Sequence, residues 1–320
     1  MRFSVIRKAG IFFGAVTLGA VSAASGWAAE IWVTNMKSAN VVVLDPSSLK
    51  ILATIPTDKG SHNVRFTPDG KLAFATNRNA DNVTIIDAEA KKVLTTVSAG
   101  KGAHDTSFSP DGKLAVVSNV DADTVTWIDV ATKRAVGTLK TGAGSVMSVF
   151  TPDGGRLYAL NMKAGNISLV DVRSRRVSKT LPNGVGGMEF VPTRDWARAW
   201  GNAPPENKVI LFDLIKGETV AEITGPVDPH GMVLSPDEKR LYVVLRKGNG
   251  IAVIDTASRK VIDSATIGKG PEMIAISPDG KTLYVSGKAE DRLIVVSASD
   301  LRVIAKVATG KEPHGVSYRR

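Results

Sequence analysis

The chain has no cysteine among its 320 residues. It therefore cannot form a disulfide, carry a lipoprotein anchor or attach a c-type haem covalently. It also lacks the Gly-x-Ser-x-Gly and His-Glu-x-x-His motifs and any glycine-rich phosphate loop. Common hydrolases, zinc proteases and nucleotide-binding enzymes carry these motifs. Their absence favours a binding module over an enzyme.

The N-terminus has the pattern of an export signal. Arg2, Arg7 and Lys8 precede an apolar run over residues 9–24, and small residues follow up to Ala29. This pattern predicts a signal peptide over residues 1–28, cleaved after Ala28, which directs the chain to the periplasm. Residues 29–320 then form one domain with no membrane span.

The charge of the chain favours anionic partners. The formal charge is +10, and loss of three basic residues, with no acidic residue before Glu30, gives 10 − 3 = +7 for the mature chain. A field of this sign attracts carboxylates, phosphates, acidic proteins or nucleic acid.

Two markers show that the chain is an internal repeat. Pro-Asp recurs at Pro68, Pro110, Pro152, Pro236 and Pro278, with a degenerate Pro192-Thr193 between, so the steps are 42, 42, 40, 44 and 42 residues. A second series recurs every 42 residues, at Asp45, Asp87, Asp129, Asp171, Asp213 and Asp255. A period of this length with four short β-rich runs is typical of propeller blades. The sequence predicts an all-β, seven-bladed β-propeller with four antiparallel strands per blade.

The repeat also predicts the strands and the ring closure. Within one blade we expect strands at 63–67, 72–76, 82–86 and 92–97, with Pro-Asp-Gly as the turn between the first two. The first mature strand, 30–35, has no strand before it in its blade. Residues 314–318 supply it, so the C-terminal strand is expected to join the N-terminal blade and close the ring.

Several segments resemble a known repeat. They are Val33-Thr34-Asn35, Ala75-Thr76-Asn77, residues 82–87 and residues 102–112. They resemble the YVTN-type repeat of exported bacterial β-propellers, over essentially all of residues 30–320. The resemblance implies seven blades and leaves the role open, because propellers of this type have diverse functions.

One blade departs from the repeat. Two residues are missing between Asp171 and Pro192, and two are gained before Asp213 within residues 201–207. Arg198 stands between Trp196 and Trp200 at a position where other blades carry an aromatic residue. The blade is either a degenerate repeat with local repair or a grafted contact surface.

All four histidines occupy one repeat position, just before the innermost strand. In ring order the position reads His230, Glu272, His314, His62, His104, Val146, Gly186. The first five lie on consecutive blades and form an arc. Basic residues in loops of the same face follow this arc: Lys59, Lys101, Lys269, Lys311, Arg78, Arg246 and Lys288. We interpret this face as a funnel for an anionic ligand or partner, with exposed histidines that titrate near neutral pH.

Other interpretations stay open. The histidines could be inherited loop consensus. Zinc or copper could bind His62, His104, His230, His314 and Glu272, provided that the rings lean inward across blades.

A non-covalent haem would need one histidine, as in d-type haem propellers, which the chain resembles only in architecture. A lyase- or lactonase-like enzyme would use Glu272 as acid or base. Nucleic acid is a weak candidate because the arc lacks an aromatic stacking platform. We expect a monomer.

Overall fold

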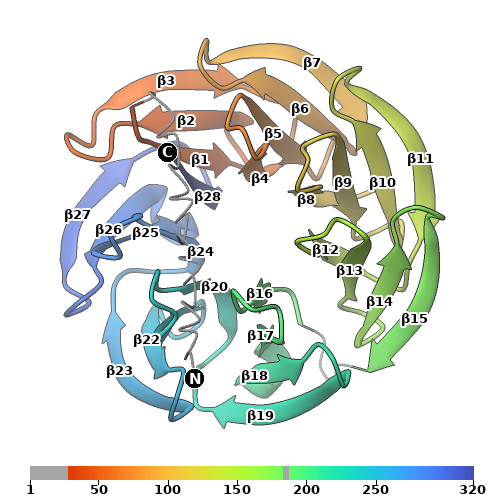
Figure 1. The fold of residues 1–320 in the computed structure, drawn as a ribbon. Coiled ribbons are helices and arrows are strands. Elements are labelled where there is room, and N and C mark those ends of the chain that lie inside the picture. Colours follow the sequence, from red (N-terminus) through yellow and green to blue (C-terminus); the bar gives the residue numbers. More distant parts are fainter. Residues whose placement is uncertain (1–27, 183–186) are drawn as a thin grey trace, which may run out of the picture.

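A computed structural model describes residues 28–182 and 187–320. The predicted signal peptide and two positions of the repeat, Asn183 and Gly186, lie outside the described residues, apart from Ala28. Seven four-stranded sheets form a ring around a central axis, as Figure 1 shows. The strands pair antiparallel within the described sheets, for example β4 with β5 and β6 with β7. The predicted seven-bladed propeller is confirmed.

The strands of each blade run from the channel outward. Blades 1 to 3 consist of β28 (Pro313–Arg319), β1 (Glu30–Asn35), β2 (Asn40–Leu44) and β3 (Ile51–Pro56); β4 (Ser61–Phe66), β5 (Leu72–Asn77), β6 (Asn82–Asp87) and β7 (Lys92–Ser98); and β8 (Ala103–Phe108), β9 (Leu114–Asn119), β10 (Thr124–Asp129) and β11 (Arg134–Lys140). Blades 4 and 5 consist of β12 (Ser145–Phe150), β13 (Arg156–Asn161), β14 (Asn166–Asp171) and β15 (Arg176–Pro182); and β16 (Phe190–Pro192), β17 (Arg198–Ala203), β18 (Lys208–Asp213) and β19 (Glu218–Thr224). Blades 6 and 7 consist of β20 (Pro229–Leu234), β21 (Arg240–Leu245), β22 (Gly250–Asp255) and β23 (Lys260–Thr266); and β24 (Pro271–Ile276), β25 (Thr282–Gly287), β26 (Arg292–Ser297) and β27 (Val303–Ala308).

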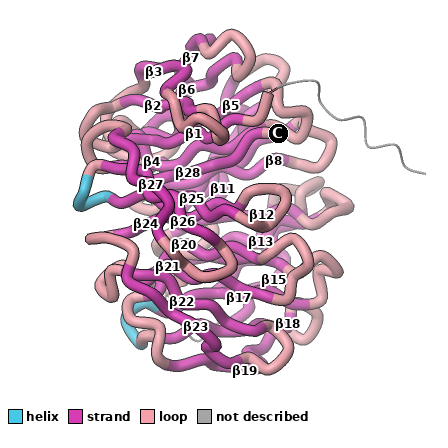
Figure 2. The backbone as a smooth tube through the Cα atoms, turned by 90° about the vertical axis from the view of Figure 1, so that its left-hand side faces the viewer, coloured by secondary structure: helices cyan, strands magenta, loops and turns pink. Residues whose placement is uncertain are grey.

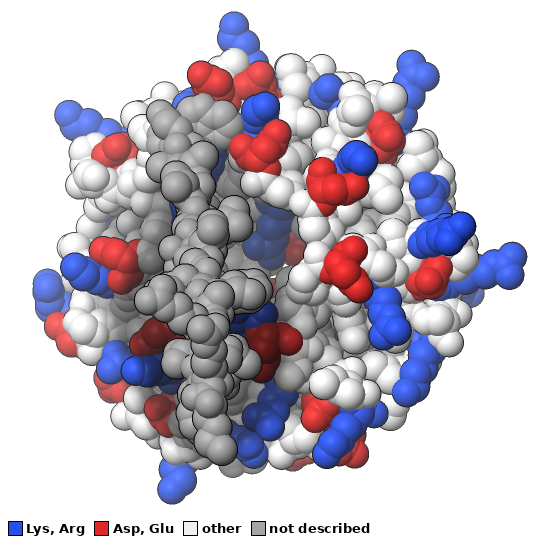
Figure 3. Space-filling model, viewed as in Figure 1, with Lys and Arg blue, Asp and Glu red and all other residues white. Residues whose placement is uncertain are grey.

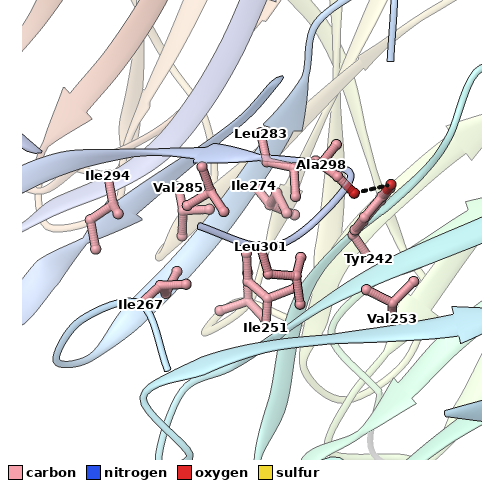
Figure 4. Packing of buried hydrophobic residues seen from close by; sticks show 12 residues of the cluster. Tyr242, Ile251, Val253, Ile267, Ile274, Leu283, Val285, Ile294, Ala298 and Leu301 are labelled. Atoms are coloured by element: carbon pink, nitrogen blue, oxygen red, sulfur yellow. Dashed lines mark hydrogen bonds between the residues drawn. The ribbon is translucent and has the colours of Figure 1, made fainter. Parts of the chain in front are cut away.

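Apolar side chains of the second and third strands hold neighbouring blades together. Between blades 6 and 7, Tyr242 and Ile251 pack against Leu283 and other buried residues (Figure 4). The Tyr242 hydroxyl donates a hydrogen bond to the Ala298 carbonyl at 3.0 Å, so the phenol is buried without losing its polar partner. Burial of each such side chain contributes about 1.5–3 kcal/mol.

The repeated aspartates serve the turns, as expected. Asp111 Oδ1 accepts a hydrogen bond from the Ser109 hydroxyl at 2.6 Å and another from the Lys113 amide at 3.1 Å. Asp87 accepts from the amides of Glu89 and Ala90 in the turn after the third strand. Their carboxylates are occupied by local backbone.

The two faces of the ring carry different loops. Figure 2 shows the C-terminus on one side and two short 3-10 helices, η1 (Pro204–Glu206) and η2 (Lys288–Glu290), on the other. The helix side holds the loops before the inner strands and after the second strands, which hydrogen-bond to each other: the Arg78 amide donates to the Gly60 carbonyl at 2.9 Å. This common face, on which the histidine loops lie, is called the histidine face below. The opposite face carries the turns between the first and second strands and is called the turn face below. On the turn face, acidic and basic side chains are interspersed and do not gather in one patch (Figure 3).

The predicted ring closure is confirmed. β28 pairs with β1, with Ile31 opposite Tyr318 and Val33 opposite Val316. A buried ion pair, which sequence analysis missed, accompanies the closure: Arg319 Nη1 lies 3.0 Å from Glu30 Oε2. Arg319 also donates to the Ala88 carbonyl at 2.8 Å, in blade 2.

The degenerate blade is packed like the others. Trp200 is buried in the core between blades 5 and 6, and Trp196 packs against the core between blades 4 and 5. Only Arg198 of the three residues is exposed. The two tryptophans therefore have a packing role. The predicted loss and gain of two residues is wrong: the loop 204–207 between β17 and β18 is as long as the loop 78–81 between β5 and β6, and Thr193 with Asp195 forms the turn that Thr67 with Asp69 forms in blade 2. Trp200, and not Arg198, stands at the aromatic position, because Trp200 pairs with Leu211 as Phe74 pairs with Ile85. No helix in the described part of the chain is long and apolar enough to cross a membrane.

We predict that removal of β28 unfolds the protein. A chain that ends at Lys311 loses the inner strand of blade 1, exposes the channel edge of β1 and leaves Glu30 without Arg319. Its thermal unfolding, followed by far-UV circular dichroism, should occur at a much lower temperature than in the full chain or be undetectable. A truncated chain that melts at the full-length temperature would contradict the closure.

Candidate functional site at the channel mouth

The predicted arc exists, and it is buried. His62, His104, His230, Glu272 and His314 are each the second residue of an inner strand, on β4, β8, β20, β24 and β28. Their exposed fractions lie between 2 % and 6 %. The expectation of an exposed histidine rim is therefore wrong: the rings line the interior just below the mouth of the channel.

The imidazole rings form a continuous stack. The ring centroids of His62 and His314 lie 3.7 Å apart, and those of His62 and His104 lie 4.2 Å apart. His230 meets His314 edge to face at 6.1 Å. The inward lean that a shared ligand requires is present between adjacent blades.

Glycine after histidine explains why neighbouring inner strands approach so closely. A Cβ atom at Gly315 would lie 2.7 Å from the His62 carbonyl oxygen, and one at Gly231 would lie 2.7 Å from the Glu272 carbonyl oxygen. Real Cβ atoms do not approach other atoms this closely, so any other residue would push the strands apart.

Hydrogen bonds between blades fix the tautomers of two histidines. His62 Nδ1 lies 3.1 Å from the His104 carbonyl oxygen, and His314 Nδ1 lies 3.1 Å from the His62 carbonyl oxygen. A carbonyl only accepts, so Nδ1 carries the proton in both rings. Their Nε2 atoms consequently keep a free lone pair.

Hydroxyl groups of the second strands hold these carbonyls in place. Thr34 donates to the His62 carbonyl at 2.6 Å and Thr76 donates to the His104 carbonyl at 2.9 Å. Ser286 donates to the His314 carbonyl in the same way. The threonine of the repeat thus positions the histidine of the next blade.

His62, His104 and His314 are neutral at neutral pH. Burial lowers the pKa of His62 well below 6.5, and the neighbouring rings and Arg78 act in the same direction. Burial also lowers the pKa of His314 well below 6.5, although Glu272 opposes the shift, and it lowers the pKa of His104 to about 4. The expectation that these rings titrate near neutral pH is therefore wrong for these three.

Glu272 is ionised. Burial alone would raise its pKa, but the hydrogen bond from His230 and the charges of neighbouring groups, including Lys288, outweigh burial and lower the pKa to about 2. His230 Nε2 lies 3.0 Å from Glu272 Oε2. Candidate ligand atoms of His230, Glu272 and His314 all lie within 4.8 Å of one another. Of the five predicted metal ligands, the structure brings these three together.

The predicted basic residues fall into two groups. Arg78, Arg246 and Lys288 are half-buried beside the arc, whereas Lys59, Lys101, Lys269 and Lys311 are exposed on the outer loops. Both groups meet carboxylates that sequence analysis did not include. Arg246 forms two hydrogen bonds with Asp228, at 2.9 and 3.2 Å, and Lys311 lies 2.7 Å from Asp291.

Arg78 and Lys288 differ from Arg246 in the strength of their contacts. Arg78 Nη2 lies 3.8 Å from Asp121 Oδ2, and Lys288 Nζ lies 3.7 Å from Glu272 Oε1. Both distances exceed a hydrogen bond. These two side chains keep donor groups directed to either end of the arc.

A second charged cluster involves inner-strand residues further from the mouth. Arg65 forms two hydrogen bonds with Asp105, at 3.0 and 3.2 Å. Buried Glu189, at the same repeat position as Asp105 but on blade 5, interacts electrostatically with both. Sequence analysis missed this cluster.

A cavity of about 690 Å³ lies away from the arc, on the turn face between blades 2 and 3. It is lined by turn residues such as Pro68, Asp69 and Asp111, whose carboxylates already accept local hydrogen bonds. We place the candidate site at the arc on the histidine face, because the side chains there have nitrogen and oxygen atoms that can bind a ligand.

Two families match parts of the chain. Residues 223–319 match the YNCE-like beta-propeller family, and residues 30–141 match the Cytochrome D1 heme domain. Each match covers less than half of the chain. The YVTN-type resemblance stays an expectation beside them. No curated protein sequence matches the chain significantly.

Solved structures share the fold at low identity. The chain is similar to hydrazine synthase of Kuenenia stuttgartiensis, with 20% identity and a TM-score of 0.71 over 80% of this chain and 88% of that one. It is similar to the dihydro-heme d1 dehydrogenase NirN in complex with DHE, with 17% identity and a TM-score of 0.69 over 90% and 74%. A putative 6-phosphogluconolactonase of Bacteroides fragilis has 16% identity and a TM-score of 0.77 over 92% and 99%. At these identities the likeness shows the propeller fold alone.

We predict that Glu189 makes stability fall with rising pH. Burial raises the pKa of Glu189 from 4.5 to about 8, with Asp105 acting in the same direction and Arg65 opposing it. Between these values the folded protein holds a proton that the unfolded chain has released, so the free energy of unfolding decreases as pH rises. Glu189→Gln should therefore be more stable than wild type at pH 8, by up to about 4 kcal/mol, and similar to it at pH 4.5.

Urea unfolding at both pH values measures this difference, with Glu89→Gln, an exposed glutamate, as the control. Equal stability of wild type and Glu189→Gln at pH 8 would show that Glu189 is ionised in the folded protein.

Proposed function

We propose that the protein is an exported, periplasmic binding module that binds a small carboxylate-bearing ligand at the arc on its histidine face. The observation that carries the proposal is the placement of Arg78 and Lys288. Both are half-buried and flank the arc, and neither side chain has a hydrogen bond to a described residue.

The lack of charge on the histidines determines which chemical groups the ligand must have. Because the rings carry no charge, Arg78, Arg246 and Lys288 supply the positive charge near the arc. The Nε2 lone pairs of His62 and His314 accept hydrogen bonds from a hydroxyl or amine. The site therefore suits a ligand that combines a carboxylate with donor groups.

The exposed lysines suit a second, weaker role. Lys59, Lys101 and Lys269 lie on the outer loops of the same face, where they would steer an anionic ligand or an acidic protein towards the mouth. Nucleic acid is the least suitable partner, because the arc offers buried imidazoles and no exposed aromatic platform.

A haem-type tetrapyrrole is the second candidate. The segment that matches the Cytochrome D1 heme domain contains His62 and His104, and NirN, which has the same fold, was solved with DHE. Haem bears carboxylates, and its iron takes imidazole as an axial ligand. The donor types fit: His62 or His314 would supply the imidazole nitrogen, and Arg78 and Lys288 would hold the carboxylates. Bound haem would add redox chemistry at the mouth.

Replacement of both flanking cations tests the proposal. Arg78→Met/Lys288→Met should weaken binding of citrate or a similar carboxylate by about tenfold, which corresponds to about 1.4 kcal/mol. The matched control is Lys71→Met/Lys113→Met, which removes the same charge from the turn face. Isothermal titration calorimetry measures both, and ferric haem in the same panel, followed by its absorbance, tests the second candidate.

If the two double variants bind the panel equally, the charge of the whole protein and not the mouth attracts anions. If wild type binds nothing in the panel, the proposed ligand class is wrong.

A further inference from the structure

We infer that His230, Glu272 and His314 form a binding site for a divalent transition metal ion of the zinc or copper class. The inference goes beyond the anionic ligand proposed above and does not depend on it. It rests on the positions of three buried side chains from three consecutive blades.

The ligand atoms already have nearly the spacing of a coordination sphere. Bonds from zinc to imidazole nitrogen or carboxylate oxygen measure about 2.0–2.2 Å, so two ligand atoms on one ion lie roughly 3–3.5 Å apart. His230 Nε2 and Glu272 Oε2 lie 3.0 Å apart, and all three groups offer atoms within 4.8 Å of one another. Small side-chain rotations would bring them to one ion.

The orientation of His314 is fixed by the pattern common among metal-bound histidines. Its Nδ1 hydrogen is donated to the His62 carbonyl, at 3.1 Å, and that carbonyl also accepts from Thr34 at 2.6 Å. Such a carbonyl partner sets the tautomer and leaves Nε2 free to coordinate. The His62 ring, 3.7 Å away between centroids, packs against His314 and limits its motion.

The His230–Glu272 pair has unused polar atoms. His230 Nδ1 and Glu272 Oε2 are buried without a well-formed hydrogen bond to any described residue, although Glu272 Oε2 lies close to His230 Nε2. His230 is 2 % exposed and Glu272 is 6 % exposed. Buried polar atoms of this kind are costly, and a metal ion bound to His230 Nε2 and Glu272 Oε2 would give the carboxylate oxygen a partner.

Two histidines of the sequence prediction are not ligands of this site. His104 lies beyond His62 in the stack, and among residues 28–182 and 187–320 no close group of three ligand atoms includes either ring. Three protein ligands leave a position open for water or for a donor atom of a bound molecule. The number of protein ligands is therefore that of a catalytic or ligand-binding metal site, since a structural metal site has four.

Two cations beside Glu272 allow metal binding to be distinguished from anion binding by experiment. Arg246 and Lys288 each lie 3.7 Å from a Glu272 oxygen, so their charges oppose a metal ion there. Lys288→Met should therefore strengthen metal binding and weaken carboxylate binding. Opposite responses of one variant separate the two proposals.

The test is a zinc titration of the metal-free full chain at constant pH, in competition with a chromophoric chelator, together with the visible spectrum of the Co²⁺ complex. We expect one ion per chain. Glu272→Gln and His314→Asn should each weaken zinc binding by about 10- to 100-fold, the loss seen when a metal site loses one supporting group. The control His104→Asn should change it by less than about threefold, and Lys288→Met should strengthen it.

Circular dichroism checks that each variant is folded, and Glu272→Gln, which keeps the side-chain shape, decides the outcome if His314→Asn is unstable. Absence of zinc binding by wild type would overturn the inference, as would equal affinity of wild type and Glu272→Gln. Equal loss in His104→Asn and His314→Asn would place the ion elsewhere in the stack.

Discussion

The pairing of the last strand with the first is the constraint on which the site depends. β28 supplies His314, the central member of the arc, and only its pairing with β1 places that ring between Glu272 of blade 7 and His62 of blade 2. The buried pair of Glu30 with Arg319 lies at the same junction. Glu30 Oε1 also lies 2.6 Å from Lys91 Nζ, so the buried carboxylate holds two cations at this junction. The two ends of the domain thus close the ring and complete the candidate site together.

Close approach of the inner strands determines the chemistry at the mouth. Gly231 and Gly315 allow each strand to reach its neighbour, and the imidazoles are then buried against one another. Burial keeps the rings neutral and leaves lone pairs on Nε2, which can bind a metal ion or accept a hydrogen bond. Had the rings been exposed, as the sequence suggested, they would have carried charge near pH 6.5 and favoured anions directly. The positive charge of the site instead comes from the loops above the rings.

The repeat period was sufficient to predict the architecture, because each blade repeats the same pattern of strands and turn residues. The 42-residue spacing of Asp45 to Asp255 sets the register, and the place of His314 in that register predicts the closure. The same register identified the arc, since it compares one position across blades. It could not predict burial or charge. Those depend on contacts between blades, such as the approach of Gly315 to the His62 carbonyl, and on partners from other positions, such as Asp228 beside Arg246. The Arg65–Asp105–Glu189 cluster joins different repeat positions, so a search at one position could not reveal it.

The central claim is that the stacked histidines are neutral and present Nε2 to the channel. The measurement that tests it most directly is a two-bond ¹H–¹⁵N correlation spectrum of the imidazoles at pH 6.5, because the chain has only four histidines and single substitutions assign them. The account predicts neutral rings for His62, His104 and His314, with the proton on Nδ1 in His62 and His314. Imidazolium signals for these rings, or a proton on Nε2 in His62 and His314, would contradict it.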